Sequence, residues 1–138
     1  MSASIEQQAA QPADPAFDFF EFANLPVAEI FTKLVWVCDG HLAEATVLYD
    51  LVLFYKANQD LNEWRTKSSR ELGREYGQEG NGIQMNRAIS DLTLEELIEQ
   101  KPVVRNMPRK YKLDWVALSH LIVELDEKLP GMKLPYGY

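Results

Sequence analysis

The sequence predicts a mainly α-helical domain with one small β-hairpin, an α+β fold. Three observations support this. Apolar residues in Leu42–Ala57 recur at three- and four-residue spacings, which is the pattern of a helix with a wide apolar face. A shorter helix, a glycine-rich turn and another helix then follow. Finally, Lys101–Arg105 and Arg109–Leu113 are short segments of basic and apolar residues, and the turn residues Asn106-Met107-Pro108 join them as in a hairpin.

Length and composition indicate one globular domain with tails. The chain has 138 residues, of which 46% are hydrophobic and 25% charged. No apolar run reaches the roughly 20 residues of a membrane span. The segment Met1–Glu6 lacks the basic start and apolar stretch of a secretory signal, so we expect a cytoplasmic protein with no membrane partner.

The few cysteines and histidines give no basis for a metal or cofactor site. Cys38 is the only cysteine, which excludes an internal disulfide framework and a cysteine-based zinc site. His41 and His120 are far apart in the sequence, so we expect no metal and no cofactor.

The two ends of the chain differ in composition from the middle. Residues 1–16 are rich in Ala, Gln, Ser and Pro and predict a disordered arm, and residues 130–138 predict a flexible tail. Residues 17–41 form an aromatic-rich extension that we expect to pack on the core domain, residues 42–129. Its Phe17–Phe22 segment has four phenylalanines in six residues and would dock either on this core, which we favour, or on a partner.

Local signals define the shorter elements. Ala28–Val37 is compatible with a strand or a helix. Ser68 and Glu71 form a capping-box pattern that opens a helix over Ser69–Tyr76. Residues 77–82 contain three glycines and predict a turn, and they lack the lysine and Ser/Thr of a phosphate-binding P-loop. A further helix is predicted over residues 82–92.

The last predicted helix carries an apolar stripe and begins after Asp114, which can cap it. We call this set of residues the C-terminal stripe. Its spacings alternate between three and four residues, and its members are Trp115, Leu118, Ile122, Leu125 and Leu129. The stripe would either pack on the long first helix of the same chain or pair with its copy in a two-fold homodimer. Both alternatives stay open.

Several of these segments resemble a known family in order and spacing. Ala43–Tyr55 resembles the first helix, Ser68–Gly73 the second, and Met85–Leu92 the recognition helix of winged helix-turn-helix domains. Leu97–Glu99 resembles the exit from the recognition helix into the wing, and Pro108–Leu113 resembles the return strand of the wing. The resemblance is to domains of phage and plasmid replication proteins and of bacterial transcription regulators, and it covers roughly residues 42–115. It implies DNA binding in transcription regulation or replication control.

Two departures from the family pattern are visible. Glu96 stands where the family usually has a glycine in a sharp left-handed turn, so residues 94–96 could extend the helix instead. The turn before the recognition helix is also longer and richer in glycine than the tight form.

The resemblance places residues 82–92 in the major groove of duplex DNA. The amides of Gln84 and Asn86 can pair with adenine, and Arg87 can bind a guanine edge or a phosphate. Asn81 and Ser90 would add contacts. Further basic residues would bind phosphates from the flanking segments: Arg65, Lys67, Arg70, Arg74, Arg105, Arg109 and Lys110. The simpler alternative is that Arg87 pairs with Asp91, and Arg70 or Arg74 with nearby glutamates.

The net charge of −7 argues at first against a nucleic-acid partner. However, residues 64–112 hold ten basic and seven acidic side chains, or +3, whereas the rest of the chain totals −10. The alternative function is therefore a protein-interaction module, or an acidic DNA mimic that inhibits a nucleic-acid-handling protein. Its partner would bind the acidic ends or the Phe17–Phe22 segment.

No arrangement of residues indicates an enzyme. His41 lies near Asp39, but no nucleophile accompanies them in a recognisable pattern. The adjacent carboxylates Glu95-Glu96 and Asp126-Glu127 point in divergent directions on helices, unlike a catalytic acid–base pair.

Overall fold

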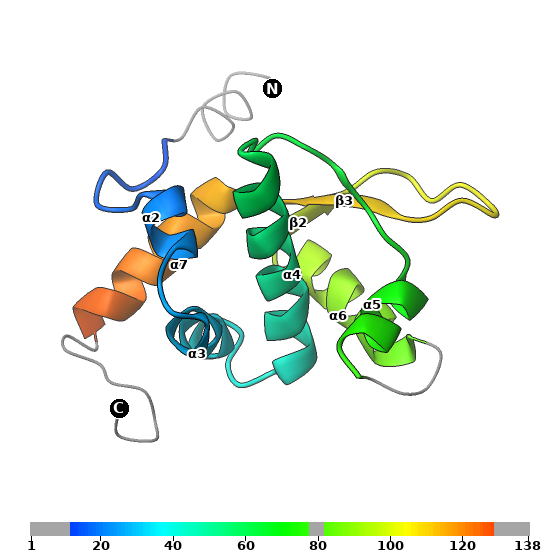
Figure 1. The fold of residues 1–138 in the computed structure, drawn as a ribbon, viewed down its shortest axis with the longest axis horizontal. Helices are drawn as coiled ribbons and strands as arrows, with labels where there is room; N and C mark the ends of the chain where they lie inside the picture. The colour runs from blue at the N-terminus through cyan, green and yellow to red at the C-terminus, as the bar shows by residue number, and fades with distance from the viewer. Residues whose placement is uncertain (1–11, 78–81, 129–138) are drawn as a thin grey trace.

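The structure is a computed structural model that describes residues 12–77 and 82–128 (Figure 1). Within these ranges the chain forms six helices and a three-stranded antiparallel sheet, which confirms the predicted mainly helical α+β class. The elements are α2 (Phe19–Ala23), α3 (Val27–Val37), α4 (Leu42–Asn58), β1 (Arg65–Thr66), α5 (Ser69–Glu75), α6 (Ile83–Leu94), β2 (Ile98–Gln100), β3 (Lys110–Leu113) and α7 (Trp115–Lys128).

Helix α4 is the centre of the fold. Helices α2, α3 and α7 lie on one side of it, and α5 and α6 lie on the other (Figure 1). Most of its circumference is therefore buried, with Ala45, Leu48, Leu51 and Val52 each 0% exposed, whereas Leu53 is 37% exposed. This confirms that its wide apolar face contacts more than one neighbour.

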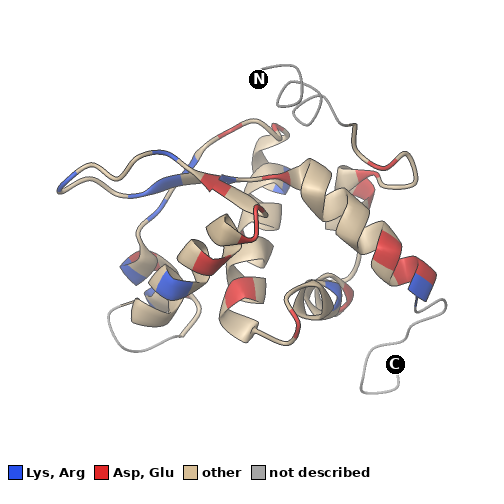
Figure 2. Cartoon of the chain, turned by 180° about the vertical axis from the view of Figure 1, so that it is seen from behind, with Lys and Arg blue, Asp and Glu red and all other residues tan. Residues whose placement is uncertain are grey.

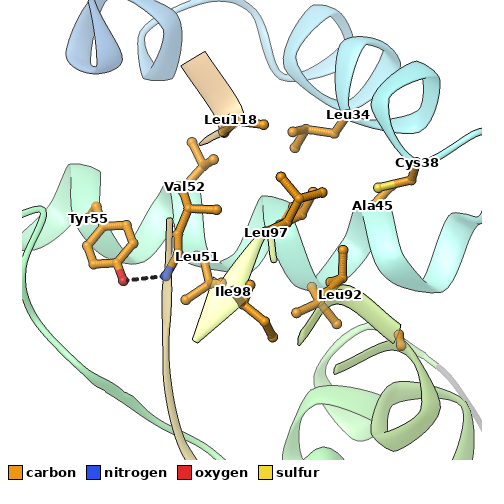
Figure 3. Close-up of a cluster of buried hydrophobic side chains, with 14 of the residues drawn as sticks. Leu34, Cys38, Ala45, Leu51, Val52, Tyr55, Leu92, Leu97, Ile98 and Leu118 are labelled. Atoms are coloured by element: carbon orange, nitrogen blue, oxygen red, sulfur yellow. Dashed lines mark hydrogen bonds between the residues drawn. The ribbon is translucent and has the colours of Figure 1, made fainter. Parts of the chain in front are cut away.

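The core gathers side chains from elements that are distant in the sequence. Leu34 of α3, Leu92 of α6 and Leu118 of α7 meet the α4 side chains in Figure 3. The Tyr55 hydroxyl accepts a hydrogen bond of 3.0 Å from the Leu113 backbone N–H, which ties α4 to the end of β3.

The sheet order is β1-β3-β2, with Arg65 opposite Tyr111 and Ile98 opposite Leu113. The prediction of a strand over residues 101–105 is wrong, because the strand β2 lies earlier. Leu97 and Ile98 are each only 3% exposed and anchor this strand in the core, whereas residues 101–105 are exposed. The segment just before α5 forms the third strand, β1, which pairs with β3.

Helix α6 ends at Leu94 and does not continue through Glu96. Glu96 adopts a left-handed φ of +62°, its N–H donates to the Thr93 carbonyl, and the Leu97 N–H donates to the Leu92 carbonyl. These two bonds are a Schellman cap, in which glycine usually occupies the left-handed position. The turn expected of the family is thus present with glutamate in it.

The N-terminal extension is helical and docked. Phe19 and Phe22 are 3% and 5% exposed and pack into the chain's own core, in agreement with the favoured interpretation. The segment 28–37, for which strand and helix were both open, lies in helix α3.

The two predicted tails lie largely outside the described residues. Residues 1–11 of the expected arm and all of the expected tail fall there. Residues 12–16 of the arm contact α7, because the Asp14 N–H donates to the Ser119 hydroxyl at 3.0 Å and the Pro12 carbonyl lies 3.1 Å from His120 Nε2. In the described part of the chain, no helix is long and apolar enough to cross a membrane.

Gly82 fixes how closely α5 and α6 approach. It has a left-handed φ of +77°, and a Cβ built on it would lie 2.5 Å from the Ser69 backbone carbonyl carbon and oxygen. Gly77 has a similar φ of +73° but has nothing within 4 Å of such a Cβ. Substitution of Gly77 would therefore add backbone strain alone, whereas substitution of Gly82 would add both strain and a clash between the helices.

We expect Gly82→Ala to destabilise the protein by about 3 kcal/mol or more, because it adds an inter-helix clash to left-handed strain. Gly77→Ala should cost only the strain, about 1–2 kcal/mol. Urea denaturation followed by circular dichroism measures both. Equal losses for the two variants would contradict the close approach at Gly82.

Candidate nucleic-acid interface

Helix α6 presents a polar arc to solvent. It packs on α4 and α5 through Met85, Ala88, Ile89 and Leu92, each at most 3% exposed. At about 100° per residue, this leaves Arg87 near the middle of the exposed arc, with Gln84 and Asn86 towards its two edges. All three are exposed, as the sequence predicted, and Ser90 is half-buried. The predicted site residue Asn81 lies outside the described residues.

Two apolar residues on this arc were not predicted as exposed from the sequence. Ile83 is 61% exposed and Leu94 is 83% exposed, although both belong to α6. The available signal was their position, because each interrupts the polar face of an otherwise amphipathic helix. Apolar side chains beside amide side chains are suited to contact a thymine methyl group in the major groove.

The arginines of α5 and α6 form no ion pair with any described residue. The Arg87–Asp91 pair considered from the sequence does not occur within 4.0 Å, and Arg70 and Arg74 likewise have no such partner in residues 12–77 and 82–128. The glutamates of α5 have other contacts. Glu71 closes the predicted capping box with Ser68, and Glu75 pairs with Lys67.

A buried polar cluster involves two of the predicted phosphate contacts. Asp50, in the middle of α4 and 3% exposed, accepts from Lys67 at 3.2 Å, from Arg65 at 3.3 Å and from the Tyr76 hydroxyl at 2.9 Å. We call these residues, together with Glu75, the Asp50 cluster. Burial, and next the Asp50 carboxylate, raise the pKa of Tyr76, so this hydroxyl remains a donor.

The Asp50 cluster corrects the prediction for Lys67. Its side chain is only 7% exposed and its ammonium contacts two carboxylates, so it is not available to a phosphate. A buried ammonium requires such partners, because burial without them is strongly unfavourable. Arg65 is also engaged, since its guanidinium contacts Asp50 and lies 4.7 Å from the centre of the Phe54 ring.

The β2–β3 hairpin is basic from Gln100 onwards. Residues 100–113 contain five basic side chains and no acidic one. The predicted residues Arg105 and Lys110 are exposed, and Arg109 donates to the Gln100 side chain at 3.1 Å. The sequence analysis did not single out Lys101 and Lys112, whose ammonium groups lie 4.8 and 4.9 Å from the centre of the Trp64 ring.

The charges are separated in space. Lys and Arg are concentrated along the hairpin and on α5 at one end of the molecule, where β2 and α6 also carry acidic residues, whereas the last turns of α7 at the other end carry mainly acidic residues (Figure 2). The positive segment identified from the sequence therefore corresponds to one region of the surface, although residues of the Asp50 cluster are excluded from it.

A small acidic site adjoins the polar arc. A cavity of about 270 Å³ between the start of α4 and α6 is lined by Glu44, Gln84, Arg87 and Asp91, among others. The Glu44 side chain is 8% exposed, and its Oε1 has no hydrogen-bond partner within the described part of the chain. Burial, and then the nearby Glu95 carboxylate, raise the pKa of Glu44 to about 7.

Cys38 is buried, and the potential metal ligands do not cluster within the described part of the chain. Burial raises the pKa of the Cys38 thiol to about 12, so it stays protonated and is a poor nucleophile. Over residues 12–77 and 82–128, no group of three or more His, Cys, Asp or Glu side chains is placed to hold a metal ion.

Part of the C-terminal stripe packs into the chain's own core. Leu118 and Ile122 are 0% and 2% exposed and belong to the hydrophobic core, so these two side chains cannot form an exposed dimer seam. Trp115 and Leu125 are half-buried, and Leu129 lies outside the described residues. Intrachain packing, one of the two alternatives, accounts for the buried pair.

Comparison with known proteins adds no relative. No family model, no curated protein and no solved structure matches this chain.

We expect Asp50→Asn to destabilise the protein by about 3–5 kcal/mol, because it leaves the Lys67 and Arg65 charges without their shared carboxylate. The control is Asp126→Asn, which removes a 48% exposed carboxylate that pairs with Lys33 and should cost under about 1 kcal/mol. Chemical denaturation at neutral pH measures both. A loss for Asp50→Asn no larger than for the control would contradict the importance of the Asp50 cluster.

Glu44 makes stability dependent on pH. Its pKa in the folded chain is about 7 against an ordinary 4.5, so the folded state binds the proton more tightly than the unfolded state. Its contribution is complete below pH 4.5 and is lost as the pH rises to about 7, by about 2–3 kcal/mol.

Glu44→Gln should therefore flatten the fall in stability between pH 4.5 and 7, as measured by thermal denaturation across that range. The control is Glu124→Gln in α7. A hydrogen bond from Lys128 lowers the pKa of Glu124, so its loss cannot remove a decline above pH 4.5. The idea fails if Glu44→Gln retains the parental slope.

Proposed function

We propose that this protein is a winged helix-turn-helix protein that binds duplex DNA through α6. Helices α4, α5 and α6 would be its three-helix core, and the β2–β3 hairpin would be its wing. In support, α5 and α6 pack on each other across the close approach at Gly82, and β1 joins the hairpin as a third strand.

One observation carries the proposal. The exposed arc of α6 places Gln84, Asn86 and Arg87 in solvent, while neighbouring arginines on α5 form no ion pair with a described residue. A helix in the major groove reads bases through amide and guanidinium groups, and it needs cations nearby for the phosphates. Residues 100–113 of the hairpin, which include five basic side chains and no acidic one, provide a second set of such cations.

The contacts divide into two kinds. Gln84 and Asn86 would pair with base edges such as adenine, and Arg87 with a guanine edge or a phosphate. Arg70 and Arg74 on α5, together with Arg105, Arg109 and Lys110 on the hairpin, would bind phosphates and fix the register.

The overall charge of −7 shapes the expected behaviour. Bulk attraction to DNA is absent, so binding would depend on specific contacts. A protein that needs its particular site suits transcription regulation or replication control. The competing function is an acidic protein-binding module or DNA mimic. It would use the acidic end of α7, and the arginines of α5 and α6 would make no contact with the partner.

The test is selection from random duplexes at near-physiological salt, followed by titration of the enriched duplex. We expect an enriched motif, whose symmetry also reports whether a dimer binds. Substituting Arg87, Arg109 and Lys110 together with alanine should abolish this binding at physiological salt. At low salt, the slope of log affinity against log salt should fall by about 2–3, since each lost phosphate contact removes about 0.9.

A matched control keeps the charge loss equal. Alanine at Lys33, Lys56 and Lys128 also removes three positive charges, but from α3, α4 and α7, and should leave the selected motif bound. Failure to enrich any duplex, or equal losses for both triple variants, would contradict the proposal.

A further inference from the structure

The tip of the β2–β3 hairpin exposes apolar side chains that have no neighbour to cover them. Val103 is 71% exposed, Val104 60% and Met107 57%. The hairpin projects away from the helices, so its tip stands clear of the rest of the described chain (Figure 1). We call residues 102–108 the hairpin tip.

The hairpin tip has a defined shape. The Met107 N–H donates to the Val104 carbonyl at 3.1 Å, and Asn106 between them takes a left-handed φ of +64°. At its base, the Lys101 N–H donates to the Lys110 carbonyl at 2.9 Å. Pro102 and Pro108 lie at its two ends, where proline restricts the backbone. A constrained tip keeps its apolar side chains outward at little entropic cost of binding.

The charges around the tip indicate the kind of partner. Lys101, Arg105 and Arg109 alternate with the apolar residues, and no acidic residue lies between Gln100 and Leu113. An apolar projection within a purely basic surface complements a polyanion that also offers an apolar interior. The stacked bases between two phosphate backbones provide this combination.

We propose that the hairpin tip inserts Val103, Val104 and Met107 between base pairs from the minor groove and bends the duplex. This inference rests on the proposed DNA-binding function. With α6 in the major groove, a neighbouring hairpin reaches the adjacent minor groove, where apolar wedges unstack base steps and kink DNA in architectural proteins. Lys101, Arg105 and Arg109 bind the phosphates on either side of the opened step.

Bending adds a source of sequence preference that α6 does not supply. Pyrimidine–purine steps, above all TA, unstack most readily, so a site with such a step under the hairpin tip is favoured. The protein thereby reads a position at which it makes no hydrogen bond to a base.

The experiment measures bending in an end-labelled duplex of about 30 base pairs that carries the motif enriched by the selection above, with a TA step next to it. Energy transfer between the ends should rise when the full-length protein binds. A fluorescent adenine analogue at the TA step should brighten as the step unstacks.

The test variant exchanges apolar for polar groups of similar shape: Val103→Thr, Val104→Thr and Met107→Gln. We expect energy transfer and analogue fluorescence to return to the values of the free duplex, and binding to weaken about tenfold. The salt dependence should stay unchanged, because every basic residue remains. The control also makes three exchanges of apolar for polar groups, but at exposed apolar positions away from the hairpin: Val27→Thr, Leu53→Gln and Leu121→Gln. It should bend DNA like the parent.

The outcomes separate the two proposals. If the parent binds the duplex without bending it, or if the tip variant bends it equally, the inference is overturned while DNA binding stands. If the parent binds no duplex, both fail. Vesicles of phosphatidylcholine and phosphatidylserine form a further arm: binding of the parent to these vesicles in preference to the duplex, lost in the tip variant, overturns the inference in favour of a lipid surface.

Discussion

The carboxylate of Asp50 is the constraint on which the arrangement of the basic surface depends. It is buried in the central helix α4, where a charge is tolerated only with close partners. Those partners are Arg65 of β1, Lys67 just before α5 and Tyr76 just after α5. The cluster therefore holds β1 and both ends of α5 against α4. Helix α6 in turn packs on α5 at Gly82. The Asp50 cluster therefore also fixes the direction in which the polar arc of α6 faces.

This arrangement changes the meaning of the charge distribution. Arg65 and Lys67 contribute to the positive segment of the sequence, yet their charges are compensated by Asp50 and Glu75. The exposed positive charge lies instead on α5, α6 and the hairpin, and the acidic last turns of α7 lie at the opposite end (Figure 2). A negatively charged protein can thus present one basic region, and the contacts made there matter more than total charge.

Local patterns were sufficient for the helices from α4 onwards, but not for α2, α3 or the sheet. The periodicity of residues 42–57 predicted α4 to within one residue, and Asp114 caps α7 as expected by accepting from the Ala117 N–H at 3.0 Å. In contrast, strand β2 was placed too late, because basic and apolar residues after Gln100 look like a strand but have no core to contact. The turn at Glu96 was only partly predicted: the family pattern places a left-handed turn there, but glutamate in place of glycine also allowed the helix to extend.

The sequence by itself determined helices α4 to α7, the caps of α5 and α7 and the set of candidate contacts on α6, since these depend on residues within a few positions of one another. Only the tertiary structure decided which of those candidates are exposed. It buried Lys67 against Asp50 and Leu118 against the core, and it left Arg87 without the neighbouring Asp91 as a partner. Each of these outcomes depends on contacts between segments far apart in the chain or on a choice among competing partners, and no local pattern encodes that information.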